Sequence, residues 1–253
     1  MHKDDLARSF APRGPAAASA RRPLSERTDT IERMSKKPAL AAPSIDPLEL
    51  HDLEDGDVAR LEAHGMVDAT RFTGGDISGD DLSGLSFNEC ELIGVTAHET
   101  QLRAARFVST RIERMNAPVF TAARATVRDA EIRSSRMGSM ELYDTDWQNV
   151  VVSGSKLGFV NLRAARMRDV RFTGCAIDEL DLSGAQLSRV AFDECTVETL
   201  RLDGARLVNV DLRGLDMHVV AGIEGMRGAT LSHEQTVLMA PLFAEHLGVR
   251  VDG

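Results

Sequence analysis

Residues 180–184 read Leu180-Asp181-Leu182-Ser183-Gly184, and the pattern of this pentapeptide decides the fold of the chain. Its central leucine belongs to a series in which every fifth residue is apolar, from Phe72 to Met217. The series has thirty members and no shift of frame. Because 43% of the 253 residues are apolar, chance would produce such a run with a probability of roughly 10⁻¹¹. A repeat with a period of five therefore organises this part of the chain.

The other positions of the pentapeptide are also regular. Two residues before nearly every centre lies a small or apolar residue, as at Ala125, Cys175 and Val210, with Asp80 as the main exception. The residues beside the centre are mostly polar. The last position is often glycine, as at Gly154 and Gly214. Glycine there favours a turn, because it adopts positive φ without a steric penalty. Two inward positions and one turn in five residues fit neither a helix nor a flat strand, and they describe a chain that winds around a narrow square.

Three segments carry a resemblance to a known family: Leu180–Gly184, Val160-Asn161-Leu162-Arg163-Ala164 and Val210-Asp211-Leu212-Arg213-Gly214. They resemble the repeats of the pentapeptide repeat proteins, whose motif is A(D/N)LXX. The resemblance covers about residues 70–219. It implies an all-β fold, a right-handed quadrilateral β-helix with four repeats per coil, which gives this chain about 7.5 coils. The first position is often larger than Ala and the second is seldom Asp or Asn, departures that should leave the fold intact.

In such a fold, residues twenty apart stack in columns, about 4.8 Å from one coil to the next. One outward column reads Arg71, Glu91, Arg111, Glu131, and this alternation of charge suits neighbouring strands. Cys175 and Cys195 are neighbours in an inward column, which predicts buried thiols rather than a disulfide or a metal site.

Ten large apolar residues of the series are expected to form the structural core. They are Phe72, Leu82, Phe107, Leu142, Trp147, Leu162, Phe172, Leu182, Phe192 and Leu202.

The composition divides the chain into four segments. Residues 1–45 are rich in Ala, Pro, Ser and Arg without apolar periodicity, which predicts a disordered tail, and Met34 is an alternative start of translation. Residues 46–68 form a lead-in whose apolar residues are expected to cover the first coil. Residues 69–219 form the β-helix, and residues 220–253 a short α-helical cap.

The carboxyl-terminal segment has the signals of a helix. Ser232 and Gln235 have the spacing of a capping box. Pro241 predicts that the helical segment splits in two, with Gly248 as the final stop. Some pentapeptide repeat proteins dimerise through such a helix. We expect this one to cover the last coil of a monomer.

The sequence offers little chemistry. It has no phosphate-binding loop, no dinucleotide-binding glycine motif and no CxxC pair. Asp178, Glu198 and His218 stack in successive coils and could hold a divalent ion, although a solvated acidic face is the simpler interpretation. We therefore expect no enzyme, no cofactor and no metal.

Binding to a protein is the function that the architecture favours, because solenoids present long ladders of side chains. The partner itself is unidentified. Two sets of residues are candidates for contact with it. The first is acidic and lies in the first coils: Asp76, Asp81, Glu89, Glu91 and Glu99. The second is apolar: Val119, Tyr143 and Phe159.

The resemblance also implies an alternative, a DNA mimic that binds DNA gyrase, a type II topoisomerase, and modulates quinolone action. Charge speaks against it. Residues 69–219 carry a formal charge of −4, with many arginines between residues 103 and 136, whereas about 36 Å of duplex DNA carries roughly 21 negative charges. The net charge of −9, the absence of a long apolar run and three cysteines predict a cytoplasmic protein without direct nucleic-acid or membrane binding.

Overall fold

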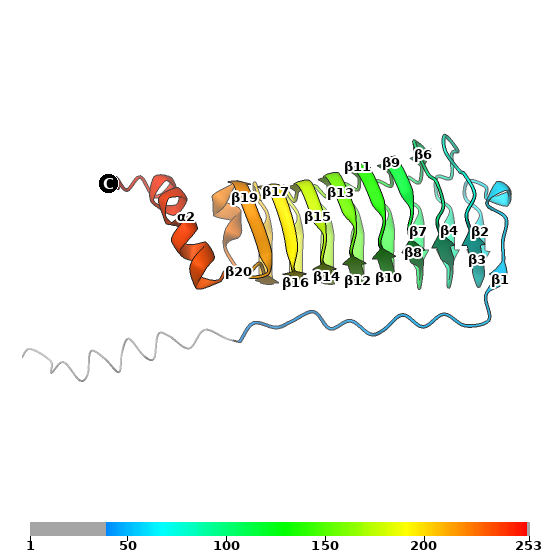
Figure 1. The fold of residues 1–253 in the computed structure, drawn as a ribbon, viewed down its shortest axis with the longest axis horizontal. Helices are drawn as coiled ribbons and strands as arrows, with labels where there is room; N and C mark the ends of the chain where they lie inside the picture. Colours follow the sequence, from blue (N-terminus) through cyan, green and yellow to red (C-terminus); the bar gives the residue numbers. More distant parts are fainter. Residues whose placement is uncertain (1–38, 252–253) are drawn as a thin grey trace, which may run out of the picture. The chain divides into compact units, whose positions relative to one another are not determined.

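The chain winds into a parallel β-helix of stacked coils (Figure 1). Most pentapeptides bury their central residue and the residue two positions before it. The structure, a computed structural model, describes residues 39–251. All thirty residues of the series from Phe72 to Met217 are buried except Met217, which is half-buried. Residues twenty apart pair across neighbouring strands, as Val127, Trp147 and Met167 do. The quadrilateral β-helix expected from the period of five is therefore confirmed.

The strands form two parallel sheets that wrap the core. Sheet A contains β1 (Glu54–Asp55), β2 (Met66–Asp68), β3 (Thr70–Thr73), β4 (Ser86–Asn88), β5 (Glu91–Ile93), β7 (Arg106–Val108), β8 (Arg111–Glu113), β10 (Thr126–Arg133), β12 (Asp146–Ser153), β14 (Arg166–Thr173), β16 (Gln186–Asp193), β18 (Arg206–Asp211) and β20 (Ala229–Thr230). Sheet B contains β6 (Thr100–Gln101), β9 (Asn116–Thr121), β11 (Arg136–Glu141), β13 (Lys156–Asn161), β15 (Ala176–Asp181), β17 (Cys195–Arg201) and β19 (Leu215–Ala221). Outside the sheets lie the 3-10 helices η1 (Val58–Arg60) and η2 (Ile223–Met226) and the helix α2 (His233–His246).

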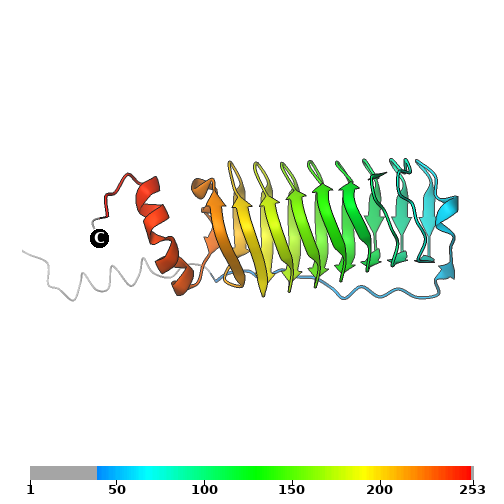
Figure 2. The same cartoon turned by 45° about the horizontal axis from the view of Figure 1, so that its top comes forward.

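The β-helix is longer than the apolar series. Ten strands of sheet A follow one another from β1 to β20, which makes about nine coils where the sequence predicted about 7.5 (Figure 2). At one end Glu54 pairs with Thr70, and at the other Ala229 pairs with Val210. The apolar period does not predict these added strands, because backbone N–H and C=O groups can pair whatever side chains their residues carry.

The turn position imposes a left-handed backbone on residues other than glycine. In the eight-residue strands of sheet A, Asp129, Asn149, Asp169 and Arg189 bend the chain around a corner with φ of 50–57°. The parallel hydrogen bonds on both sides of the corner stabilise this conformation. The glycine signal was therefore correct but incomplete. At Gly214 the reason for glycine is a close contact and not a positive φ, because a Cβ there would lie 2.4 Å from the carbonyl oxygen of Phe192.

An extended segment, residues 40–53, runs along the coils, and we call it the strap (Figure 1). The backbone N–H of Ser44 donates to Asp169 Oδ1 at 3.0 Å, and Arg111 Nη2 donates to the carbonyl of Leu48 at 3.2 Å. The amide of Ala41 reaches Asn209 Oδ1 at 3.4 Å. From Ala41 to Leu48 an extended chain covers about 23 Å, which matches nearly five coils at the strand spacing.

The strap changes the expected division of the amino-terminal region. Residues 40–45 were assigned to a disordered tail, but the structure places them in the strap, continuous with residues 46–53. The prediction of disorder for residues 1–38, and the alternative start at Met34, lie outside the described residues. Further along, Val58 and Leu61 pack against the core as expected, whereas Met66 is 79% exposed and covers nothing.

The carboxyl-terminal end is held by one glutamine. Ser232 and Gln235 form the predicted capping box at the start of α2. The Gln235 Nε2 group also donates to the carbonyls of Leu212 and Leu215, at 2.7 and 2.8 Å, and so satisfies acceptors of the last coil. η2 contributes Met226 to the core, whereas none of the residues of α2 is fully buried.

The prediction that Pro241 splits the helix was wrong. α2 runs unbroken from His233 to His246 with Pro241 inside it. Proline removes one backbone donor, and here the acceptor left without it belongs to Val237, which is 59% exposed, so water can satisfy that carbonyl. Gly248, with φ of 69°, ends the helix as expected. No helix in the described part of the chain is long and apolar enough to cross a membrane.

Candidate binding surfaces

The predicted column of alternating charge is a continuous network of ion pairs, which we call the ladder: Arg71, Glu91, Arg111 and Glu131. The Glu91 carboxylate accepts from Arg71 Nε at 2.7 Å and from Arg111 Nη1 at 2.6 Å. The Arg111 Nε group donates to Glu131 at 2.9 Å. Burial opposes ionisation of Glu91, but the two arginines outweigh it and hold the pKa of the carboxyl group below its usual value.

This network removes Glu91 from the acidic candidates for partner contact. The residue is only 6% exposed, and both of its oxygens are occupied by arginines. An acidic residue with this sequence context was expected on an open surface. Glu91 instead pairs with Arg71 and Arg111, the arginines of the two neighbouring coils.

The other acidic candidates are exposed but do not form one patch. Asp76 and Asp81 lie on successive sides of one coil. The serine two residues on lowers the pKa of each carboxyl group, first through its side-chain hydroxyl and then through its backbone N–H. Glu99 lies in the next coil, close to Gln101, the bridge partner of Asp81. Glu89 stands at a different corner of the square. Asp76 and Glu99 therefore share one side of the first coils, and Asp81 lies on the next side.

The apolar candidates are less exposed than a binding patch requires. Val119 and Phe159 do share an outward column, with Ser139 paired between them. Tyr143 stands in another column, on the next side of the coil. All three side chains are half-buried. The structure supports Val119 and Phe159 as neighbours and separates Tyr143 from them.

The ten expected core residues are all buried, with exposed fractions from 0% at Leu162 to 4% at Phe107. Phe172 and Phe192 stack with ring centroids 4.8 Å apart. Cys90, Cys175 and Cys195 are buried free thiols, as expected from their inward positions. His218 lies 3.6 Å from Glu198, and the described residues contain no group of three or more His, Cys, Asp or Glu side chains that could hold a metal ion.

Sequence analysis missed a basic side of the β-helix, which we call the arginine face. Two outward columns form it, one on each side of the buried residues Trp147, Met167 and Leu187. The first column is Arg106, Thr126, Asp146, Arg166, Gln186 and Arg206, and the second is Val108, Arg128, Gln148, Arg168, Ser188 and Val208. Sorting the arginines by their place in the twenty-residue coil would have found it.

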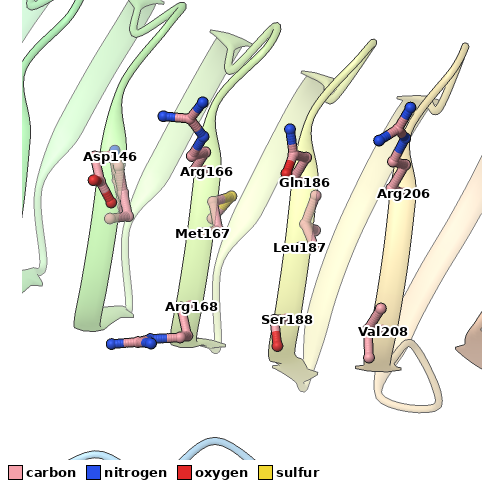
Figure 3. A pocket seen from close by; sticks show the side chains of 10 residues that line it. Asp146, Arg166, Met167, Arg168, Gln186, Leu187, Ser188, Arg206 and Val208 are labelled. Atoms are coloured by element: carbon pink, nitrogen blue, oxygen red, sulfur yellow. The ribbon is translucent and has the colours of Figure 1, made fainter.

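The arginine face is hollowed between Asp146 and Val208. A shallow depression of about 320 Å³ is lined by side chains of both columns (Figure 3). Arg166 and Arg206 come from the first column, with Gln186 between them, and Arg168 comes from the second. The depression thus has three guanidinium groups around it and one carboxylate, that of Asp146.

The repeats, the stacked coils and the outward ladders define a class of protein: β-helical solenoids built from five-residue repeats. Residues 155–193 match the family model of pentapeptide repeats, in eight copies. The chain carries pentapeptide repeats, as the sequence resemblance implied.

Two solved structures illustrate how far the similarity extends. A trypsin-treated form of QnrB1, a plasmid-mediated fluoroquinolone resistance protein, is 21% identical, and the match covers 76% of this chain and 92% of that chain with a TM-score of 0.33. HetL, a pentapeptide repeat protein involved in heterocyst differentiation regulation from the cyanobacterium Nostoc sp. strain PCC 7120, is 17% identical, with 67% and 90% covered and a TM-score of 0.30. No curated protein matches the chain. At these identities and TM-scores the similarity assigns no function.

Proposed function

We propose that this chain is a non-enzymatic scaffold that binds a protein partner along the sides of its β-helix. One observation carries the proposal: the outward polar side chains stand in straight columns on flat sides, as in the ladder and on the arginine face. Catalysis needs groups that converge on one reacting atom. Columns with one side chain per coil suit a long contact with another macromolecule instead.

The proposal includes a place and a state for the protein. The three buried free thiols suit a reducing compartment, and we propose the cytoplasm. The contacts of Gln235 hold α2 against the last coil, and we propose a monomer for this reason.

A capture experiment tests the scaffold and its apolar candidates. Tagged full-length chain is cross-linked in lysate of its host, and the captured proteins are identified for the native chain, Phe159→Asp and Thr199→Asp. Thr199 lies in the same outward column two coils further on, so it controls for added charge. We expect a partner that Phe159→Asp loses and Thr199→Asp keeps. Equal capture by all three chains would exclude Phe159 as a contact, and no specific partner at all would overturn the scaffold.

A gyrase-directed DNA mimic is the alternative, and the acidic surface of the first coils is the observation that favours it. Asp76, Asp81 and Glu99 are exposed there, and residues 76–99 contain no Lys or Arg. A supercoiling assay with gyrase of the same host tests it directly. Inhibition or protection at micromolar concentrations, lost on changing the three carboxylates to amides, would establish the mimic. Unchanged supercoiling would eliminate it.

A further inference from the structure

The arginines of this chain differ in whether they make ion pairs, and several unpaired ones gather on one face. Most arginines of the ladder and the neighbouring columns make short ion pairs, as Arg71, Arg189 and Arg213 do at 2.5–2.7 Å. On the arginine face, Arg106, Arg128, Arg166 and Arg206 are exposed and make no ion pair with any of the residues that the structure describes. The fifth, Arg168, approaches a carboxylate oxygen of Asp169 only to 3.9 Å.

The neighbours in the columns explain why these charges stay open. Within the arginine face most coil neighbours of the arginines are neutral, namely Thr126, Gln148, Gln186 and Ser188. The exception is Asp146, which is the coil neighbour of Arg166 but forms no ion pair with it. Asp146 is the single carboxylate among the twelve residues of the two columns, so the face carries a formal charge of +4.

Two carboxylates at the adjacent corner make hydrogen bonds within the fold. Asp129 accepts a hydrogen bond from Asn149 at 2.8 Å. Asp169 holds Arg189 through two hydrogen bonds and the strap through the amide of Ser44. Both corner carboxylates are therefore committed within the fold.

Like charges on one face repel one another, and an anionic partner on that face would relieve the repulsion. The arginines extend over six coils, from Arg106 to Arg206, about 24 Å at the strand spacing. Guanidinium groups bind carboxylates in a bidentate manner. The depression between the columns gives an extended chain room to lie between Arg168 on one side and Arg166 and Arg206 on the other (Figure 3).

We propose that the arginine face binds an acidic, extended polypeptide segment of a partner protein. This inference rests on the proposed scaffold function and names the surface and the partner class. Two observations favour a polypeptide over nucleic acid. The only aromatic ring of the face, Trp147, is 3% exposed, so bases find no stacking platform. The chain as a whole carries −9, which repels a long polyanion and tolerates a short acidic segment.

A defined peptide tests the proposal without knowledge of the partner. The probe is a fluorescein-labelled dodecapeptide of alternating glutamate and glycine, which places its carboxylates on one side of an extended chain. Its binding to the full-length chain is measured by fluorescence anisotropy at low salt. We expect Arg166→Glu/Arg206→Glu to weaken binding at least tenfold.

The matched control is Arg103→Glu/Arg136→Glu. Both of these arginines are exposed, lie on other sides of the β-helix and make no ion pair with a described residue, so the charge change is the same. We expect this variant to bind within twofold of the native chain. Equal loss in both double variants would show non-specific attraction and overturn the proposal. Circular dichroism verifies that all variants are folded.

Two further arms complete the experiment. A single-stranded oligothymidylate and a short DNA duplex are measured beside the peptide, and tighter binding of either would overturn the assignment to a polypeptide. The captured partner from the scaffold experiment is then tested with the same double variants. A partner that Arg166→Glu/Arg206→Glu retains leaves the scaffold intact and excludes this face. If the lysate yields no partner but the peptide still binds, the proposed scaffold function is wrong, whereas the binding of acidic segments by the arginine face is supported.

Discussion

The ladder and the arginine face lie on neighbouring sides of sheet A and meet in β10. β10 bends at Asp129, so Thr126 and Arg128 belong to the arginine face while Glu131 belongs to the ladder. On the ladder every arginine bonds a glutamate in the next coil. On the arginine face the coil neighbours are mostly neutral, and the one carboxylate, Asp146 beside Arg166, forms no ion pair with it. The backbone is the same on both sides. What differs is whether the residue twenty positions away forms an ion pair with the arginine, and that pairing decides whether an arginine stabilises the fold or remains open for a partner.

The two settings predict different energies for the same side chain. Arg111 is 19% exposed and bonds two glutamates that are themselves nearly buried. Removing one member of a buried pair leaves an uncompensated charge and costs about 3–5 kcal/mol. Replacing an exposed arginine that has no partner changes the free energy of unfolding by no more than about 0.5 kcal/mol. Measuring the free energy of unfolding of arginine variants on the ladder and on the arginine face therefore tests this comparison.

The largest effect is expected for Arg111→Ala. The change leaves Glu91 with one arginine, takes the Nε donor from Glu131 and removes a hydrogen bond to the strap. Glu91 keeps Arg71 and Glu131 keeps Arg133, so neither carboxylate is left without a cation. We expect a loss of about 2 kcal/mol in the free energy of unfolding, measured by urea denaturation. The paired control is Arg166→Ala, where the change should stay within about 0.5 kcal/mol. Similar losses in the two variants would show that position along the coil, not pairing, governs the energy.

Particular residues show how much of the fold can be predicted from the sequence. The apolar period placed Phe72, Trp147 and Phe192 in the core, and the twenty-residue column predicted the bond from Arg71 to Glu91 before the structure was known. Local patterns suffice for these features because each coil repeats one arrangement of backbone and side chains. The resemblance and the stacking rule therefore supplied the fold and its register.

Features without a period were not predictable. The strap follows the coils by contacts between residues more than a hundred positions apart, such as Ser44 and Asp169, which no local pattern encodes. Pro241 remains within a helix because that side of α2 faces water, which only the packing reveals. The sequence predicts Glu91 as a surface contact. It is buried instead, because Arg71 and Arg111 fold over it, and no local pattern encodes that arrangement. The arginine face needed the same spatial sorting of columns.

A moderate effect is expected from acid. The pKa of Glu91 is lowered by the two arginines against the effect of burial, and the pKa of Asp169 is lowered by Arg189 first and also by the amide of Ser44. Groups with a lowered pKa in the folded state stabilise it above their unfolded pKa, near 4. That stability is lost as the pH falls through the folded values. Urea midpoints should therefore be level from pH 7 to about pH 5 and decline below it.

The acid prediction separates the two sides through one variant. Glu91→Gln cannot ionise, so it should be less stable than the native chain at pH 7 and should approach it at pH 3. Arg166→Gln removes no partner of a carboxylate and should decline in parallel with the native chain. Parallel curves for Glu91→Gln as well would show that the ladder does not govern acid unfolding.

The smallest effect concerns the arginine face itself. If its charges serve a partner and not the fold, Arg166→Gln/Arg206→Gln should leave the free energy of unfolding within about 0.5 kcal/mol of the native value. The sign should be stabilising at low salt, because the change relieves repulsion with Arg168, and the difference should vanish in 0.5 M NaCl, where charges are screened within about 5 Å. Thermal unfolding at 20 mM and 0.5 M NaCl measures both. A destabilisation above about 1 kcal/mol would mean that these arginines support the coils, and the two sides would then differ in degree and not in role.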